Sequence, residues 1–174
     1  VNTPISPYAA SKHAAEAYAY TYHKQFGIDV TILRYFTVFG PGGRPDMAPY
    51  RFAKWILEGT PITLYGDGTQ SRDFTYIDDI ARGTILSEKP LGFEIINLGG
   101  GKKPVTINQF INWIEELTDK KAVIHNLPFN SVDMFETMAD VSKANKILNW
   151  FPEIDTFCGI EQMLNNIDLF KYES

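Results

Sequence analysis

Near the start of the sequence a tyrosine and a lysine stand four positions apart, at Tyr8 and Lys12. Side chains with this spacing lie on the same face of a helix. A tyrosine normally keeps its phenolic proton at neutral pH, but a nearby ammonium group stabilises the phenolate. A tyrosine held in this way can accept a proton from a substrate hydroxyl. The spacing alone is weak evidence, because many helices contain this pair by chance.

The residues around the pair predict the elements that must position it. Ser6 followed by Pro7 is typical of a helix start, with the serine as N-cap and the proline at the first helical position. An alanine-rich stretch follows, and Gly27 is expected to end the helix. Residues 29–36 are β-branched and apolar, which predicts a buried strand directly after this helix.

Helical and strand-like segments alternate along the rest of the chain, which favours an α/β fold. The glycines and prolines of residues 40–45 predict a loop. Further helices are expected at 50–58, 77–87, 106–118, 140–148 and 159–170, and further strands at 62–65, 73–76, 94–98 and 121–125.

Composition limits the class of protein. The 174 residues suffice for one domain with a real core, and 44% of them are hydrophobic. The net charge of −5 argues against nucleic acid as the main partner. One cysteine, Cys158, excludes an internal disulfide and suits a reducing compartment, so a cytoplasmic location is expected. No apolar run approaches the ~18 residues of a membrane span. Because the sequence begins at Val1, without a methionine, we expect it to be part of something longer.

No metal site is expected. Asp78 and Asp79 are adjacent and could suggest a metal pair, but they fit better as the N-cap and a first-turn acid of the helix at 77–87. His13, His23 and His125 do not have the spacing of metal ligands.

Several blocks of sequence together resemble the extended short-chain dehydrogenase/reductase family, and most closely its nucleotide-sugar epimerases and dehydratases. They come in the family's order and spacing and cover nearly the whole chain. Within the family, Thr37 and the loop at 43–48 are similar to the glucuronate-type 4-epimerases, whereas galactose-type enzymes usually carry asparagine at the position of Thr37. The blocks are Ser6–Lys12, Leu33–Pro41, Gly43–Ala48, Ile62–Ala81, Asn97–Gly99 and Thr137–Asp140.

The resemblance implies two parts. Residues 1–48 would be the C-terminal remnant of a Rossmann-type dinucleotide-binding domain with its parallel sheet and catalytic helix. Residues 49–174 would be mainly the smaller α/β substrate-binding domain, with some segments returning to the Rossmann sheet. The family's glycine-rich NAD-binding loop is not in this sequence, and residues 99–102 (GGGK) read as a turn after a strand. The isolated chain is therefore expected to be inactive, and to oligomerise or leave its first residues poorly ordered because it exposes a sheet edge.

The resemblance also implies roles in catalysis and cofactor binding. Tyr8 would exchange a proton with the C4 hydroxyl of the sugar. Lys12 would promote ionisation of Tyr8 and hydrogen-bond the nicotinamide ribose of NAD. Tyr35, at the end of the strand that follows the helix, would lie where the chain meets the nicotinamide.

Four residues are implied to bind the charged groups of the substrate. Thr37 and Arg44 would hold the sugar carboxylate, since the planar fork of arginine matches its two oxygens. Arg51 and Arg72 would neutralise the diphosphate, whose burial without such partners would be prohibitive.

Three more residues are implied to bind the nucleoside. Leu64 and Tyr65 would pack on the uracil ring, and Asp133 would accept hydrogen bonds from the ribose hydroxyls. Val132 stands before Asp133 where the family usually has glycine.

The implied function is that of the C-terminal part of an NAD-dependent 4-epimerase that acts on UDP-glucuronate through a 4-keto intermediate. A 4,6-dehydratase or reductase of the same family, or a non-catalytic nucleotide-sugar-binding fragment, remains as an alternative. The expected partners are a UDP-sugar and a second copy of the chain, with no nucleic acid and no membrane. A homodimer would form through the alanine-rich helix around residues 14–22.

Overall fold

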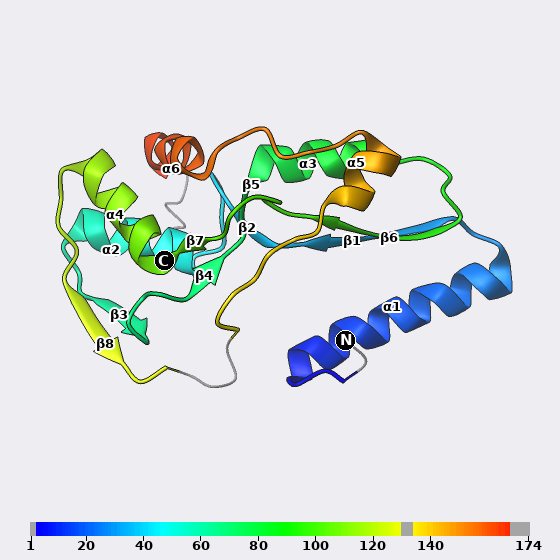
Figure 1. The fold of residues 1–174 in the computed structure, drawn as a ribbon, viewed down its shortest axis with the longest axis horizontal. Coiled ribbons are helices and arrows are strands. Elements are labelled where there is room, and N and C mark those ends of the chain that lie inside the picture. The colour runs from blue at the N-terminus through cyan, green and yellow to red at the C-terminus, as the bar shows by residue number, and fades with distance from the viewer. Residues whose placement is uncertain (1–2, 130–133, 168–174) are drawn as a thin grey trace.

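A computed structural model describes residues 3–129 and 134–167. Helices and strands alternate along the chain, as the sequence predicts (Figure 1). Within the described residues the strands form two-stranded sheets. In chain order the elements are α1 (Pro7–Phe26), β1 (Val30–Tyr35), β2 (Thr37–Phe39), α2 (Ala48–Glu58), β3 (Ile62–Tyr65), β4 (Ser71–Arg72), β5 (Phe74–Tyr76), α3 (Ile77–Leu86), β6 (Phe93–Leu98), β7 (Val105–Thr106), α4 (Ile107–Thr118), β8 (Ile124–Leu127), α5 (Ser142–Leu148) and α6 (Thr156–Asn165).

One part of the molecule is built on the parallel pair β1–β6, in which Val30 lies opposite Phe93 and Tyr35 opposite Leu98. Helices α3 and α5 lie on one side of this pair and α1 on the other (Figure 1). Parallel strands with helices on both faces are the arrangement expected of a Rossmann-type sheet. The small core on the α3–α5 side consists of Ile80, Ile96, Leu98, Ala144, Leu148 and Trp150.

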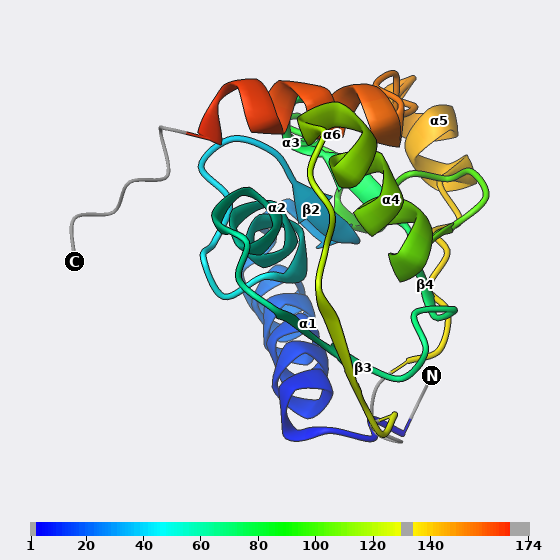
Figure 2. The ribbon, with the colours of Figure 1, turned by 90° about the vertical axis from the view of Figure 1, so that its left-hand side faces the viewer.

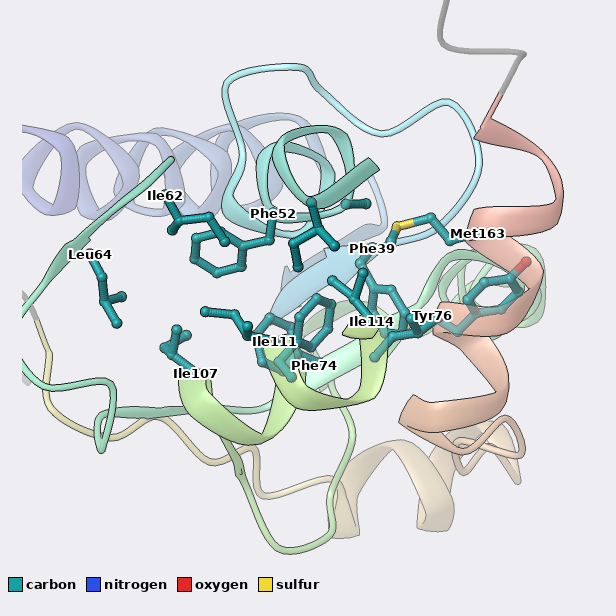
Figure 3. Packing of buried hydrophobic residues seen from close by; sticks show 14 residues of the cluster. Phe39, Phe52, Ile62, Leu64, Phe74, Tyr76, Ile107, Ile111, Ile114 and Met163 are labelled. Carbon is teal, nitrogen blue, oxygen red and sulfur yellow. The ribbon is translucent and has the colours of Figure 1, made fainter. Parts of the chain in front are cut away.

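The other part contains the parallel pairs β2–β5 and β3–β8 and the antiparallel pair β4–β7. Helices α2, α4 and α6 gather around it (Figure 2). Their apolar faces enclose the larger core, on which side chains from β2, β3 and β5 also converge (Figure 3). At its centre the rings of Phe39, Phe74 and Phe110 contact one another with centroids 4.4–6.0 Å apart.

Helix α1 begins and ends as predicted. The Ser6 hydroxyl oxygen accepts a hydrogen bond from the Ala9 backbone N–H at 3.1 Å, and Pro7 occupies the first turn. Gly27 adopts the left-handed conformation, with φ of +65°, and ends the helix. Helix α1 buries none of its 20 residues in this chain. No helix in the described residues is both long and apolar enough to cross a lipid bilayer.

Three predicted boundaries are wrong because local side chains hold the backbone differently. Asp140, expected inside a helix, instead accepts a hydrogen bond from the Ser142 N–H and precedes α5. Asp155 caps α6 through the Phe157 N–H, so that helix starts before the predicted residue 159. The Ala122 N–H donates to the Glu115 carboxylate, and β8 begins only at Ile124 instead of residue 121.

Asp78 is not the N-cap of α3, because Tyr76 occupies that position and both aspartates lie in the first turn. Asp79 is 2% exposed and anchors a distant loop. Its carboxylate accepts hydrogen bonds from the N–H groups of Glu153 and Ile154 at 2.9–3.1 Å and pairs with Arg82 at 2.7 Å. These bonds explain the burial of Asp79 better than the helix dipole alone.

The glycines after β6 form a strand-exit turn, as predicted. The structure shows why a residue without a side chain stands there. The buried carboxylate of Asp73 accepts hydrogen bonds from the N–H groups of Ala139 at 2.7 Å and Gly101 at 3.3 Å. A Cβ atom on Gly100 would lie 2.1 Å from the Asp73 Oδ1 atom. Burial outweighs these hydrogen bonds and raises the pKa of Asp73.

Candidate active site

The tyrosine and the lysine of the predicted pair converge on the first turns of α1. The Nζ atom of Lys12 lies over the Tyr8 ring, 5.4 Å from its centroid. The helical spacing alone brings them together, since both residues belong to an uninterrupted helix. Tyr8 is 73% exposed, so a ligand can reach its hydroxyl group.

An ion pair fixes the helix that carries them to strand β1. The Arg34 Nε and Nη2 atoms donate to the two carboxylate oxygens of Glu16 at 2.7 and 2.6 Å. This bidentate bond lowers the pKa of Glu16. Farther along α1, the Tyr20 ring meets the Phe93 ring edge-on at 4.9 Å. The sequence analysis did not identify this pair, because no local pattern indicates which arginine faces α1.

A cavity of about 650 Å³ brings Tyr8 together with the predicted carboxylate-binding residues. Thr37 and Arg44 line it, from β2 and from the loop that follows. Tyr35 lines it as well, and its hydroxyl group lies 3.0 Å from the Thr84 Oγ1 atom. We refer to this space as the tyrosine cavity.

A second cavity, of about 530 Å³, lies beside the first and contains the predicted phosphate-binding residues. Arg51 and Arg72 both line it, and we refer to it as the arginine cavity. Thr37 and Met47 line both cavities, so the two spaces adjoin. The fold thus places Tyr8 and two cationic side chains in adjoining cavities, although they come from separate elements.

The three arginines have different surroundings. Arg44 is paired with Asp46 through two hydrogen bonds of 3.0 and 2.5 Å, which lower the pKa of Asp46. Arg72 donates to the backbone carbonyl oxygens of Ser71 and Phe135 at 2.9 and 3.3 Å. Arg51 stacks on an aromatic ring of its own helix.

Of the two β3 residues expected to contact the base, one is buried in the core and the other is exposed at the surface. Strand β3 alternates, with Ile62 and Leu64 buried and Thr63 and Tyr65 exposed. Leu64 lines the arginine cavity but is only 4% exposed and packs in the larger core (Figure 3). Tyr65 is 56% exposed, so within this strand its ring is the surface available to a base. Asp133 lies outside the described residues.

Thr137 is a cavity residue to which the sequence analysis assigned no role. It lines the tyrosine cavity, and its hydroxyl oxygen accepts a hydrogen bond from the Asp73 N–H at 3.2 Å. The segment before it is held to β4, since the Ser71 N–H donates to the Phe135 carbonyl at 2.9 Å. Its position in the block Thr137–Asp140, which contributed to the family resemblance, was the available signal.

A third cavity, of about 490 Å³, lies between α1 and β1 and is lined by Tyr8, Lys12 and Tyr35, among others. It contains the three residues expected to contact the nicotinamide end of NAD. No cluster of three or more histidine, cysteine, aspartate or glutamate side chains able to hold a metal ion occurs within residues 3–129 and 134–167.

Comparisons with known proteins identify relatives of the chain in sequence and in fold. The chain is 58% identical over 175 residues to a UDP-glucuronate 4-epimerase of Thermodesulfobacterium geofontis, covering 98% of this chain and 54% of the relative. Its fold matches the crystal structure of a Bacillus cereus UDP-glucuronic acid 4-epimerase in complex with UDP-glucuronic acid and NAD, with a TM-score of 0.90, 42% identity, and coverage of 97% of this chain and 54% of that one. A Thermotoga maritima UDP-glucose 4-epimerase with UDP-glucose gives a TM-score of 0.87 at 30% identity, with 95% and 54% covered.

The chain spans about half the length of the curated relatives it matches. The model of the NAD dependent epimerase/dehydratase family matches residues 1–99, a stretch that contains the Tyr8–Lys12 pair and the three arginines of the adjoining cavities. On this evidence the chain belongs to the NAD-dependent epimerase/dehydratase family.

Proposed function

We propose that this chain provides the acid/base tyrosine and the sugar-nucleotide site of an NAD-dependent UDP-glucuronate 4-epimerase that works through a 4-keto intermediate. The observation that carries the proposal is the position of Tyr8, with Lys12 beside its ring, at a cavity adjoining the one lined by Arg51 and Arg72. Proton transfer at the sugar and charge neutralisation at the diphosphate can then act on one substrate. The relatives support the choice of substrate.

In this proposal Tyr8, as phenolate, takes the proton of the C4 hydroxyl and later returns it after the sugar ring has turned over. Lys12 stabilises the phenolate, and this attraction strengthens when bound substrate excludes water from the exposed pair. Arg51 and Arg72 hold the diphosphate throughout, so the ring can rotate without leaving the site. Thr37 and Arg44 bind the carboxylate, which requires Arg44 to exchange Asp46 for the substrate.

The residues between α1 and β1 fit the nicotinamide end of NAD. The third cavity offers the Tyr8 hydroxyl and the Lys12 ammonium as hydrogen-bond partners for ribose hydroxyls, with Tyr35 at the end of the adjacent strand. When bound, NAD would supply the hydride acceptor and donor for C4 of the sugar. The sequence contains no glycine-rich turn between a strand and a helix, so this chain itself offers no site of that kind for the pyrophosphate.

We further propose the domain division at residues 48 and 49, with returning segments. The returning segments are supported by β6, which pairs with β1, and by α3 and α5, which pack against β6. Strand β2 precedes residue 48 but pairs with β5 in the other part, so the division is not strict in sequence. A homodimer through α1 is also proposed, since its aromatic residues Tyr18 and Tyr22 are exposed. Light scattering of the chain and of a Tyr18→Glu/Tyr22→Glu variant tests this, and an unchanged mass would contradict it.

Two alternatives make different predictions. A dehydratase or reductase of the same family uses the same tyrosine and lysine but yields a different product. A non-catalytic fragment binds nucleotide sugar and converts nothing. The loop at 43–48, similar to glucuronate-type epimerases, favours epimerisation.

The test joins residues 1–174 to the part of the Thermodesulfobacterium geofontis relative that this chain does not cover. UDP-glucuronate is added with NAD, and the product is identified by NMR. We expect conversion to the C4 epimer, and we expect Tyr8→Phe to lower kcat by a factor of about 10²–10⁴ while substrate affinity is retained. A 4-keto-6-deoxy product, no product despite binding, or full activity of Tyr8→Phe would contradict the proposal.

A further inference from the structure

Helix α2 places a stacked arginine at the wall of the arginine cavity. The guanidinium carbon of Arg51 lies 4.3 Å from the ring centroid of Trp55, one helical turn farther along. Both residues line the cavity. Trp55 is partly buried and packs against the larger core, whereas Arg51 is exposed. The indole ring thus forms a platform that is anchored in the core and covered by the arginine.

Stacking leaves the donors of Arg51 available. A guanidinium that lies over an indole ring is held by cation–π attraction, which uses none of its N–H groups as hydrogen-bond donors. Within residues 3–129 and 134–167 the Arg51 guanidinium makes no hydrogen bond or ion pair. Asp46 pairs with Arg44, which lowers the pKa of Asp46, and the positive charge of Arg51 lowers this pKa to a smaller extent.

The other cation of α2 behaves differently. The Lys54 ammonium lies 4.0 Å from the Glu58 carboxylate, an acid of the same helix. Lys54 does not line the arginine cavity, whereas Arg51 does. Helix α2 thus directs one cation to its own surface and the other to the cavity.

We infer that Trp55 is a positioning residue, which holds Arg51 with its N–H edge ready for the diphosphate of a nucleotide. This inference rests on the proposed function, because that function places a diphosphate in the arginine cavity. A free arginine side chain loses much rotational freedom when it grips a ligand, and an arginine already stacked on a fixed ring loses less. Trp55 would therefore strengthen nucleotide binding without touching the phosphates itself.

The test is a double-mutant cycle on the chain, with UDP binding measured by calorimetry. We expect Trp55→Leu to weaken UDP binding about three- to fivefold, in line with an exposed cation–π contact, and Trp55→Phe to stay within about twofold of the parent. Arg51→Ala should weaken binding about tenfold. In the Arg51→Ala background, Trp55→Leu should change the affinity by less than about 1.5-fold, because Trp55 acts through Arg51.

Equal losses from Trp55→Leu in both backgrounds would overturn the inference and assign Trp55 to the structure of the cavity wall. An unchanged UDP affinity of Trp55→Leu in the parent background would overturn the inference too. Thermal unfolding of every variant, with Trp55→Phe as the variant that keeps an aromatic platform, excludes a folding defect as the cause.

Inorganic pyrophosphate separates failure of the inference from failure of the proposed function. If the chain binds pyrophosphate with the same dependence on Arg51 and Trp55 but shows no preference for UDP, the positioning role stands and the nucleotide-sugar function fails. If the chain binds UDP but Arg51 and Trp55 show no coupling, the nucleotide-sugar function stands and the positioning role of Trp55 fails. If neither ligand binds, both are contradicted.

Discussion

Arg34 on β1 grips Glu16 on α1 with two parallel hydrogen bonds of 2.7 and 2.6 Å. Since α1 buries no residue in this chain, this pair is a principal polar link between the sheet and the helix that carries Tyr8 and Lys12. The position of Tyr8 and Lys12 relative to the cavities therefore depends on an ion pair one to two turns away from them.

Acidification is expected to loosen α1. The pKa of Glu16 lies below its usual value of 4.5 in the folded chain, so the pair stabilises the folded state above pH 4.5 and this contribution is lost as the pH falls through the lowered pKa. Arg34 is 51% exposed, and solvent screening limits the contribution to about 0.5–1 kcal/mol. Hydrogen-exchange protection factors of α1 should fall below pH 4.5, whereas Glu16→Gln should show reduced protection already at pH 7. Equal protection of the parent and the variant at pH 7 would contradict this.

Lys12 should matter for rate more than for binding. In the joined enzyme, Lys12→Met is expected to lower kcat by about tenfold or more, because the phenolate of Tyr8 loses its stabilising charge, with a smaller effect on the affinity for UDP-glucuronate. Helix α1 offers a matched control, because Lys24 lies over the Tyr20 ring at 5.5 Å, nearly the same geometry away from the cavities. Lys24→Met should leave kcat unchanged. Similar losses from both variants would show that the lysines act on the helix and not on the chemistry.

Arg44 should distinguish acidic from neutral sugars. Its guanidinium binds the carboxylate of Asp46 through two hydrogen bonds, the geometry with which it would bind a sugar carboxylate in place of Asp46. Arg44→Ala is expected to weaken binding of UDP-glucuronate at least fivefold and binding of UDP-glucose by less than twofold. Calorimetry with the two ligands measures this, and equal losses for both would remove Arg44 from carboxylate recognition.

Two adjacent aspartates should differ sharply in their effect on stability. Asp79→Asn abolishes the ion pair with Arg82 and replaces one of the two oxygens that accept from the N–H groups of Glu153 and Ile154 by an amide donor, so we expect a loss of about 2–3 kcal/mol in the free energy of unfolding. Asp78 is exposed, and Asp78→Asn should cost less than about 0.5 kcal/mol. Urea denaturation compares them, and equal midpoints would contradict the anchoring role of Asp79.

Much of the fold could be predicted because its signals are local. Ser6, Pro7 and Gly27 mark the two ends of α1 and act only on neighbouring residues. The helix, and with it the convergence of Tyr8 and Lys12, could therefore be predicted from the local sequence. The boundaries of α5, α6 and β8 were missed where a single aspartate or glutamate captured a backbone N–H. The sequence does not reveal which face of β3 is covered, and only the structure shows that Leu64 lies in the core beside the arginine cavity while Tyr65 is exposed.

The sequence by itself determined the α/β class, the pairing of Tyr8 with Lys12 on one helix, and the family, because these depend on spacing along the chain and on the order of its motifs. Only the tertiary structure decided which arginines share a cavity, that Arg44 is engaged by Asp46 and Arg51 by Trp55, and that Thr137 joins the wall beside Tyr8. The physical reason is that a cavity is formed where strands and loops distant in sequence pack together, and the direction of each side chain there is set by neighbours that no local pattern specifies.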